Sequence, residues 1–413
     1  MSFNNVELFK YDSKGKVRVW KAESDLQIDP ITQHITITIT HGQHEGKLQT
    51  KTRVVKDGKN KGKANETTIQ QQTELELKSL YQKQLDDGYV FNIDDYKEPL
   101  RPMLAHPYKN KKHTVTWAKA AEVDGPANLN YASTKLNGIR CFIFFDFTGK
   151  ASVIRFESRT GKPFKYFEHI ALELVVRFSG KYRNAIFDGE LFNPEIPFEI
   201  ICSLVNSDEY VTVTDPETGK EWSTNDIEFH CYDIIDTEKP EEDFYTRFVI
   251  QEWSDDEHHS LRYVKSVPVE TEDEMVSLAT SWIDLGYEGL MLRSGNTTYE
   301  FGKRSINLLK YKVMEQSEFK IKRIYLAEND ESKVMFQVYN HFNEEEPYDT
   351  FDCALKGNKD LNLAYYEDRE KHENTSWLTI DYQTLSAYKV PLFPVGITVR
   401  QGTVIDGKFV PEV

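Results

Sequence analysis

A lysine that is closely followed by a glycine and an arginine begins the part of the chain with the richest candidate chemistry. Lys135 opens the segment Lys135-Leu136-Asn137-Gly138-Ile139-Arg140. A lysine amine is a nucleophile only after it loses its proton, and its ordinary pKa of about 10.4 falls only through burial or neighbouring cations. Gly138 permits a tight turn, and the fork of the neighbouring Arg140 could hold a phosphate or the ribose region. The segment indicates a nucleophilic lysine, although an ordinary lysine before a β-turn would have the same pattern.

Two carboxylate-bearing segments follow at wide intervals. Asp188-Gly189-Glu190 lies inside an apolar strand pattern, and Glu288-Gly289 precedes the apolar run Leu290-Met291-Leu292. Carboxylate oxygens suit a ribose hydroxyl or Mg²⁺, and two of them can position Mg²⁺ against phosphate oxygens. The alternative for each segment is a turn with solvated acids.

A pair of lysines closes the series. In Leu309-Lys310-Tyr311-Lys312 the two lysines are two residues apart, so a strand places both on one face. There they can neutralise the charge that develops on an α-phosphate and a leaving pyrophosphate. The alternative is a solvent-facing pair.

Taken in order, these motifs resemble those of the ATP-dependent DNA ligases. The lead-in Arg101-Pro102-Met103-Leu104-Ala105 is similar too, and the resemblance covers about residues 100 to 410. The matching segments are Lys135-x-Asn137-Gly138-x-Arg140, Ser158-Arg159-Thr160-Gly161, Asp188-Gly189-Glu190, Tyr232-Asp233, Glu288-Gly289 and Lys310-x-Lys312.

The resemblance implies a role for each matching residue. Lys135 would form the covalent lysyl adenylate, Glu190 and Glu288 would bind Mg²⁺, and the Tyr232 ring would stack on adenine, unless it is a core tyrosine. Arg140 and Arg159 would contact the nucleotide or the 5′-phosphate end. The nucleotide-binding set comprises Thr134, Arg140, Arg159, Glu190, Tyr232, Lys310 and Lys312.

The resemblance also implies the reaction. ATP adenylates the lysine with loss of pyrophosphate, AMP passes to a 5′-phosphate, and a 3′-hydroxyl displaces AMP to seal a nick in duplex DNA. Such phosphoryl transfers depend on charge neutralisation and in-line geometry, so ATP and Mg²⁺ are the expected cofactors. A mobile terminal barrel would close first over ATP and later over the duplex.

Three departures from the family pattern affect adenylation. Asn137 replaces the usual aspartate of the lysine motif, and Ser133 stands two positions before the lysine, where an acid is frequent. The C-terminal Arg-x-Asp-Lys motif is not evident near Val399-Arg400-Gln401-Gly402. Adenylation is therefore expected to be slower or to be assisted differently.

Three other functions stay open. An RNA ligase or hybrid-tolerant ligase uses the same chemistry, and the neutral Asn137 leaves room for RNA ends. An mRNA-capping guanylyltransferase shares the lysine but would form a GMP adduct. An inactive nucleic-acid-binding protein on a ligase fold is the alternative from another class.

The elements that must position these residues indicate an α+β protein. Strand-like runs span residues 139–147, 151–157 and 290–292, and the apolar spacing of Phe167, Ile170, Leu174 and Phe178 predicts a helix. A second helix is expected after a capping box of Thr271 and Glu274, with a stop at Gly286. We expect an adenylation domain over 100–315, with a surface loop at 206–226. The strands of 316–413 favour an OB-fold barrel.

Residues 1–95 are expected to form a small α+β module. Strand alternation at 17–20 and 35–40 precedes a helix-prone stretch at 67–84, and the order resembles a WGR domain, a nucleic-acid-binding module, without its Trp-Gly-Arg signature. The net charge of −16 repels a polyanion, so DNA needs a local basic surface. The stretch Lys47–Lys63 offers one as a flexible basic loop, or it is a solvated hairpin tip. Its basic residues are Lys47, Lys51, Arg53, Lys56, Lys59, Lys61 and Lys63.

Length and composition set the remaining expectations. With 413 residues, 39% of them hydrophobic, the chain is expected to form two or three domains. It has no leader pattern and no apolar run long enough for a bilayer, so we expect a cytoplasmic monomer with no membrane partner. Its four cysteines are scattered singly and are expected to be reduced core residues. The compact size and extra N-terminal module favour a viral or accessory repair enzyme.

Overall fold

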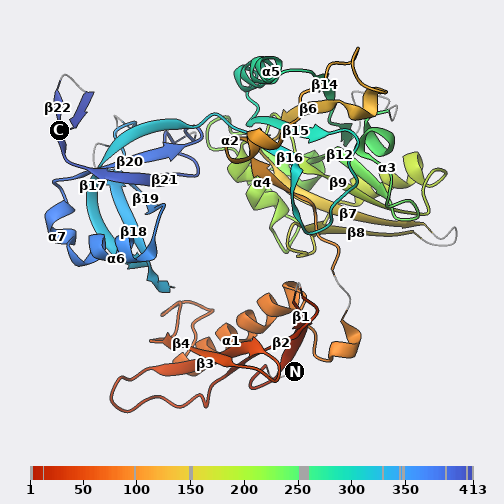
Figure 1. Cartoon of the computed structure of the whole chain (residues 1–413). Coiled ribbons are helices and arrows are strands. Elements are labelled where there is room, and N and C mark those ends of the chain that lie inside the picture. The colour runs from red at the N-terminus through yellow and green to blue at the C-terminus, as the bar shows by residue number, and fades with distance from the viewer. Residues whose placement is uncertain are drawn as a thin grey trace.

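The computed structural model shows three lobes (Figure 1). The structure describes residues 3–12, 14–96, 99–147, 152–250, 260–327, 330–343, 346, 349–386, 388–405 and 408–411. The first lobe comes from the N-terminal part of the chain, the second contains two facing sheets, and the third contains a closed barrel.

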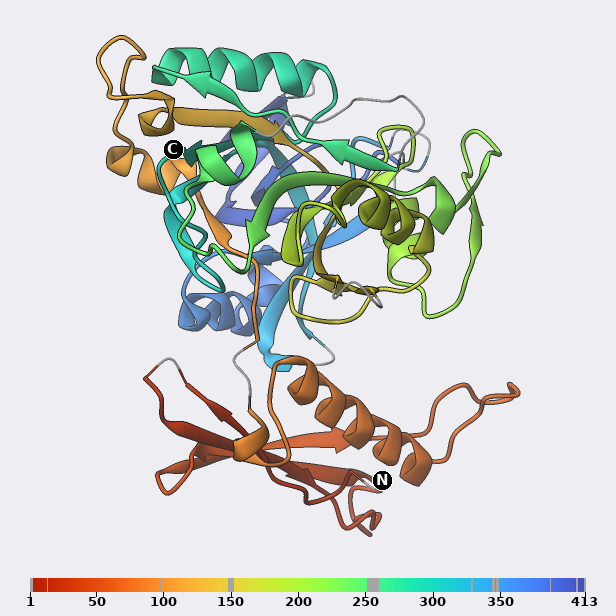
Figure 2. The ribbon, with the colours of Figure 1, turned by 90° about the vertical axis from the view of Figure 1, so that its right-hand side faces the viewer.

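The first lobe is an antiparallel sheet covered by one helix. The strands pair in chain order, β1 (Leu8–Tyr11), β2 (Val17–Glu23), β3 (Ile35–Gln43) and β4 (Leu48–Val55). The helix α1 (Ile69–Asp86) starts at a capping box of Thr68 and Gln71. Its buried Tyr81 hydroxyl lies 2.8 Å from the carbonyl oxygens of Val6 and Ala22, to one of which it donates, and it accepts the N–H groups of the same two residues, which ties the helix to the sheet. In Figures 1 and 2, α1 lies on the sheet face turned toward the other lobes.

The second lobe holds two five-stranded sheets. The order of the first sheet is β14-β6-β15-β16-β5, in which only β5 and β16 run parallel. Its strands are β5 (Leu104–Pro107), β6 (Asn130–Lys135), β14 (Val267–Val269), β15 (Gly289–Ser294) and β16 (Arg304–Tyr311). The order of the second sheet is β13-β12-β9-β7-β8, in which only β12 and β13 run parallel. Its strands are β7 (Ile139–Phe147), β8 (Ser152–Ser158), β9 (Asn184–Phe192), β12 (Glu228–Asp236) and β13 (Leu261–Tyr263).

Three apolar layers hold these sheets in place. Helix α5 (Glu272–Asp284) buries Met275 and Ala279 against the outer face of the first sheet. Helices α3 (Glu168–Phe178) and α4 (Phe198–Val205) cover the outer face of the second sheet. Between the sheets lies a smaller cluster of Met103, Phe142, Ile186, Ile235, Tyr299 and Leu308. Because this inner cluster fills only part of the space between the sheets, the remainder is available for a cavity.

The third lobe is a closed five-stranded barrel. The strands follow the order β17-β18-β19-β21-β20 around a buried apolar core. They are β17 (Glu315–Ala327), β18 (Asp330–Tyr339), β19 (Thr350–Leu355), β20 (Trp377–Tyr382) and β21 (Val395–Arg400). Helices α6 (Lys359–Glu367) and α7 (Arg369–His372) connect β19 to β20, and the hairpin β22 (Gly402–Ile405) with β23 (Lys408–Pro411) follows.

Short elements complete the chain. They are α2 (Tyr108–Lys111), the hairpin of β10 (Thr212–Thr214) with β11 (Glu221–Ser223), the π-helical turn η5 (Tyr245–Val249), and the 3₁₀ turns η1 (Ile93–Asp95), η2 (Lys112–Thr114), η3 (Pro126–Asn128) and η4 (Thr224–Asp226). Of the residues described, no helix is long and apolar enough to cross a membrane. Cys141, Cys231 and Cys353 are buried, and all four cysteines are free.

The structure differs from three expectations of the sequence. The stretch 206–226 is not a plain loop, because it contains the β10–β11 hairpin. The basic stretch is not one flexible loop either, because Lys51 and Arg53 lie in β4. The capping box of α5 is only half formed: Thr271 caps the Glu274 N–H at 3.2 Å, but the Glu274 carboxylate binds the Glu270 N–H instead. Residues 148–150, which separate the two strand-like runs 139–147 and 151–157, lie outside the described residues.

Candidate nucleotide site

The two facing sheets of the second lobe bring the motif residues to one cavity. Alternate residues of a strand point to the same face, so Tyr131, Ser133 and Lys135 of β6 all face the second sheet. The strand register sets Ser133 beside Met291, and Met291 beside Lys310. Three adjacent strands therefore supply one continuous wall.

Lys135 stands at the end of β6, where β15 begins. It pairs with Gly289 in the ladder, and its carbonyl accepts the Glu288 N–H at 2.9 Å. Its ammonium forms an ion pair with the Glu288 carboxylate. Burial lowers the pKa of the Lys135 amine and Arg140 acts in the same direction, whereas the Glu190 and Glu288 carboxylates favour the charged form. The environment thus makes this amine easier to deprotonate than a surface lysine.

Two more lysines lie beside it. Lys310 is in β16 and Lys312 directly follows that strand. Burial and the neighbouring Lys135 lower the pKa of Lys310, and the same causes lower the pKa of Lys312 to about 8. Lys312 also pairs with the second oxygen of Glu288 and donates to Gln383 Oε1 of the barrel at 3.2 Å. One carboxylate therefore bridges both lysines at this end of the cavity.

The opposite wall comes from the second sheet. Arg140 of β7 and Glu190 of β9 are cross-strand neighbours, and Glu190 is also opposite His230 of β12. Burial raises the pKa of Glu190 to about 7, against the opposing effect of Lys135 and Arg140. The Tyr232 hydroxyl donates to Glu190 Oε2 at 3.4 Å, and the Arg140 guanidinium lies 5.7 Å from the centre of the Tyr232 ring.

A β-bulge in β12 places two consecutive residues, Tyr232 and Asp233, on the inner face of the second sheet. The register between β9 and β12 shifts from Cys231 opposite Gly189 to Asp233 opposite Asp188, which leaves Tyr232 as the extra residue. A bulge reverses the alternation of side chains along a strand. Tyr232 lies on the same face as His230, which is opposite Glu190, and it lines the cavity; the bulge puts the next residue, Asp233, on that face too, where it reaches the first sheet.

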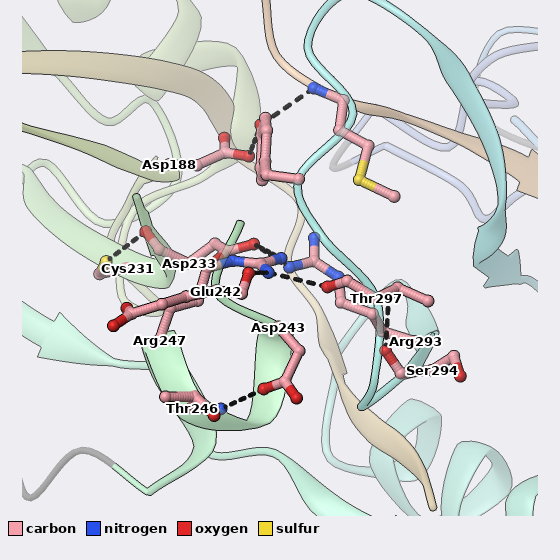
Figure 3. Close-up of polar contacts among 12 residues, drawn as sticks. Asp188, Cys231, Asp233, Glu242, Asp243, Thr246, Arg247, Arg293, Ser294 and Thr297 are labelled. Atoms are coloured by element: carbon pink, nitrogen blue, oxygen red, sulfur yellow. Dashed lines mark hydrogen bonds and ion pairs between the residues drawn. The ribbon is translucent and has the colours of Figure 1, made fainter. Parts of the chain in front are cut away.

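Two buried carboxylates support this wall. Asp188 is fully buried and accepts Arg140 Nε at 2.9 Å and Nη2 at 2.6 Å. Asp233, also fully buried, accepts Arg247 Nε at 2.7 Å and Nη2 at 3.0 Å and forms an ion pair with Arg293 of β15. Figure 3 shows the Arg247 and Arg293 guanidinium groups side by side against Asp233. Because Arg293 belongs to the first sheet, this cluster joins the two walls.

The resulting cavity has a volume of about 240 Å³. Seven of the nine residues expected in the site line it: Thr134, Lys135, Arg140, Arg159, Glu190, Tyr232 and Lys310. Glu288 and Lys312 are outside the lining but contact its lysine end through the ion pairs described above. A hollow of about 790 Å³ in the first lobe contains none of the nine.

Several residues that line the cavity are not among the nine expected from the sequence. Tyr131 and Ser133 come from β6, Met291 and Arg293 from β15, and Phe244 and Arg304 from elsewhere. The alternation of strand residues could have identified the first four. Tyr131 and Ser133 are four and two residues before Lys135, and Met291 and Arg293 are two and four residues after Gly289, so each shares a strand face with a motif residue. The cavity face opposite Tyr232 therefore carries a flexible thioether and a buried arginine.

The donor set for a metal ion is limited to carboxylates that reach the cavity. Within the described ranges, no group of three or more His, Cys, Asp or Glu side chains could hold a metal ion alone. Mg²⁺ binds through one or two carboxylates together with substrate phosphates and keeps several waters. Glu190 and Glu288 fit that pattern. Glu288 would have to release one of its two lysine partners in order to bind Mg²⁺.

Comparisons with known proteins agree with this geometry. The family model described as "ATP dependent DNA ligase domain" matches residues 102–312. A DNA ligase of African swine fever virus, from a Kenyan pig isolate, is 25% identical over 278 residues, which is 65% of this chain and 59% of that protein. The DNA ligase of a Malawian tick isolate is 24% identical over the same shares. The chain thus spans less than two thirds of the length of these relatives.

Solved structures show the same fold at low identity. The structure described as Pmar-Lig_Pre has a TM-score of 0.56 and 18% identity, covering 80% of this chain and 71% of that chain. A structure from work on Lig E DNA ligases has a TM-score of 0.51 and 18% identity, covering 73% of this chain and 100% of that chain.

Proposed function

The chain belongs to the ATP-dependent DNA ligase domain family, and from that premise we propose that it seals 5′-phosphate, 3′-hydroxyl nicks in duplex DNA through a lysyl-AMP intermediate on Lys135. One observation carries the proposal. Lys135 and Arg140 come from one segment, and Glu190 and Lys310 lie about 50 and 170 residues further along the chain, yet all four line one cavity of about 240 Å³.

Adenylation makes use of the wall formed by the first sheet. The Lys135 amine attacks the α-phosphorus of ATP, an N–P bond forms, and the P–O bond to pyrophosphate breaks. Lys310 and Lys312 lie beside this amine, where they neutralise the charge on the α-phosphate and the leaving group. Glu288 favours the charged amine, so the Lys135 ammonium releases its proton to water and becomes nucleophilic once Glu288 turns toward Lys312 or another cation.

The wall formed by the second sheet binds the nucleoside. A flat ring suits a purine face, and Tyr232 lines the same cavity as Met291 of the first sheet, whose polarisable thioether packs well against aromatic rings. Glu190 is within reach of the Tyr232 hydroxyl and is suited to accept a ribose hydroxyl. Arg140 and Arg159 are the cations on this side for a nucleotide phosphate or a 5′-phosphate end.

We further propose Mg²⁺ as the metal. Glu190 and Glu288 would hold it together with phosphate oxygens, and it would supply neutralising positive charge during each phosphoryl transfer.

The other lobes are proposed to grip the substrate. We assign residues 1–95, 100–315 and 316–413 as the N-terminal module, the adenylation domain and an OB-fold domain. The closed five-stranded barrel supports the last assignment. Exposed lysines of β4 and of the following stretch give the first lobe a local basic surface for duplex phosphates. We propose a monomer inside a cell, and the similarity to viral DNA ligases supports a virus-encoded enzyme.

The decisive test is covalent labelling. Purified protein with Mg²⁺ and α-labelled ATP is expected to form an AMP adduct, which Lys135→Ala abolishes, while Lys165→Ala, an exposed control, leaves it unchanged. A nicked DNA duplex should then be sealed, and RNA and hybrid nicks should be sealed less well. An adduct that persists in Lys135→Ala, or a GMP adduct formed in preference to AMP, would refute the proposal.

A further inference from the structure

A buried hydrogen-bond junction lies behind Arg140, and the reaction scheme above does not use it. Its centre is the Asp188 carboxylate, which has no solvent exposure. Besides the two nitrogens of Arg140, this carboxylate accepts the Tyr299 hydroxyl at 2.5 Å on Oδ2. The dashed line at Asp188 in Figure 3 marks this bond.

Tyr299 is held in place from three sides. It comes from the connection between β15 and β16, so it belongs to the wall opposite Asp188. Its hydroxyl accepts the N–H of Met103 at 2.9 Å, in the segment that leads into β5. Its ring stacks on Phe142 with centroids 6.2 Å apart and packs against Phe301 at 4.8 Å. The hydroxyl therefore has one fixed position between the sheets.

The protonation state of the junction is also fixed. Burial and the Asp188 charge raise the pKa of the Tyr299 hydroxyl well above its usual value, so the hydroxyl remains a donor. Asp188 in turn raises the pKa of Arg140, despite burial. A buried carboxylate with three donors has its orientation determined by all of them, because each lost donor leaves an unsatisfied lone pair.

Arg140 is the member of this junction that reaches the cavity. Its Nε and Nη2 donate to Asp188. Among the described residues, no group accepts a hydrogen bond from Nη1. A two-pronged contact with a carboxylate fixes the plane of a guanidinium. The direction of Nη1 therefore follows the plane of Asp188, and Tyr299 holds that plane from the opposite sheet.

We propose that Tyr299 is a positioning residue for the ligation reaction, which fixes Arg140 through Asp188 so that Nη1 meets the phosphate or ribose of the bound substrate. The inference rests on the proposed function, because it needs Arg140 to contact substrate. Tyr299 itself touches no substrate in this arrangement. It also ties the Met103 segment and both sheets to the same guanidinium.

Tyr299→Phe tests the proposal, because it removes one hydroxyl and keeps the ring. The single-turnover rate of the step that Arg140 serves, adenylation or transfer of AMP to the nick, is expected to fall about tenfold, the usual scale for a hydrogen bond to a charged group. Tyr182→Phe is the matched control, since Tyr182 is a buried tyrosine on the outer side of the second sheet. Its rates should equal those of the wild type.

Combination with Arg140→Lys separates positioning from a general structural effect. If Tyr299 acts through Arg140, Tyr299→Phe should slow the Arg140→Lys enzyme by less than about twofold, because coupled residues are not additive. A Tyr299→Phe protein with a lower melting temperature but wild-type rates would overturn the proposal. The proposal would also be overturned if the rate loss of the double variant equalled the product of the losses of the two single variants.

A folding check and the adduct assay of the wild type distinguish the possible outcomes. If Tyr299→Phe folds poorly by near-UV circular dichroism, its rates and those of the wild type are compared at a lower temperature at which the two spectra agree, with the same expected loss and the same lack of additivity. Failure of the wild type to form the Lys135 adduct would refute the proposed function itself. Wild-type adduct formation with unchanged rates in these variants would refute only the role of Tyr299.

Discussion

At the scale of single residues, the environment of each titratable group decides what it can do. Lys135, Lys310 and Lys312 are ordinary lysines by type, but burial lowers the pKa of all three, helped by Arg140 at Lys135 and by Lys135 at the other two. Glu190 moves in the opposite sense, because burial raises its pKa to about 7. The site therefore has groups that titrate close to neutral pH on both of its walls.

Lys312 gives a prediction about pH. With its pKa lowered to about 8, its ammonium is present below that pH and is lost above it, so its help in neutralising phosphate charge is lost as well. The adenylation rate should fall above about pH 8 for this reason. Lys312→Arg, whose guanidinium stays charged, should move this fall to higher pH. Measurement of the adduct-forming rate from pH 6 to 10 checks the shift, and an unmoved alkaline limb would assign it to another group.

At the scale of elements, close approach and irregularity build the site. A Cβ on Gly138 would lie 2.4 Å from the Leu191 carbonyl and 2.8 Å from Glu190 Cγ, so only glycine lets the turn after Lys135 approach β9. The bulge in β12 turns both Tyr232 and Asp233 inward. The strands thus depart from regular pairing where the second wall meets the cavity.

The Asp233 cluster leads to a prediction about stability. Asp233→Asn keeps the shape of the side chain but leaves Arg247 and Arg293 facing a neutral amide, and both arginines are buried. Removal of one partner from a buried ion pair costs about 3–5 kcal/mol. Urea unfolding should show a loss of this order, whereas Asp208→Asn, which breaks an exposed pair with Lys165, should change little. Equal stability of the two variants would contradict the structural role of the cluster.

At the scale of the whole molecule, positive charge is concentrated in one part of a chain that is negative overall. The chain carries a net charge of −16, yet β4 and the residues after it are basic and largely exposed. Not every charge there is available, because Arg53 pairs with Glu76 at 2.7 Å and Lys61 pairs with Asp57. The exposed cations that remain for duplex phosphates are Lys47, Lys51, Lys56, Lys59 and Lys63, of which Lys51, Lys56 and Lys59 lie in the middle of the stretch.

Reversal of these three charges tests the proposed DNA grip. The triple variant Lys51→Glu, Lys56→Glu, Lys59→Glu should bind nicked duplex more weakly, and its binding should depend less on salt, by about 0.9 in slope per lost phosphate contact. Formation of the Lys135 adduct should be unchanged. The control reverses Lys165, Lys220 and Lys239, which are exposed in the second lobe, for the same change in net charge. Equal weakening by both triple variants would show an effect of net charge alone.

The sequence by itself determined the chemistry and much of the framework. Residue types and order identified the lysine, the acids and the lysine pair, and periodicity predicted α3, α5 and strands β7, β9 and β15, because local hydrophobic spacing reflects which face is buried. The fold class is confirmed as a mixed α+β adenylation unit followed by a five-stranded ring of strands. The β10–β11 hairpin lies in a polar stretch with no apolar period, and local spacing gave no sign of it.

Only the tertiary structure decided which groups meet. Strand register placed Met291 beside Lys310, a bulge turned Asp233 to the same face as Tyr232, and packing of two sheets joined Tyr299 to Asp188 and Arg293 to Asp233. The division of Glu288 between Lys135 and Lys312 also depends on three strands meeting at one end. Such contacts join residues far apart in the chain, and local sequence patterns carry information only about neighbours along it.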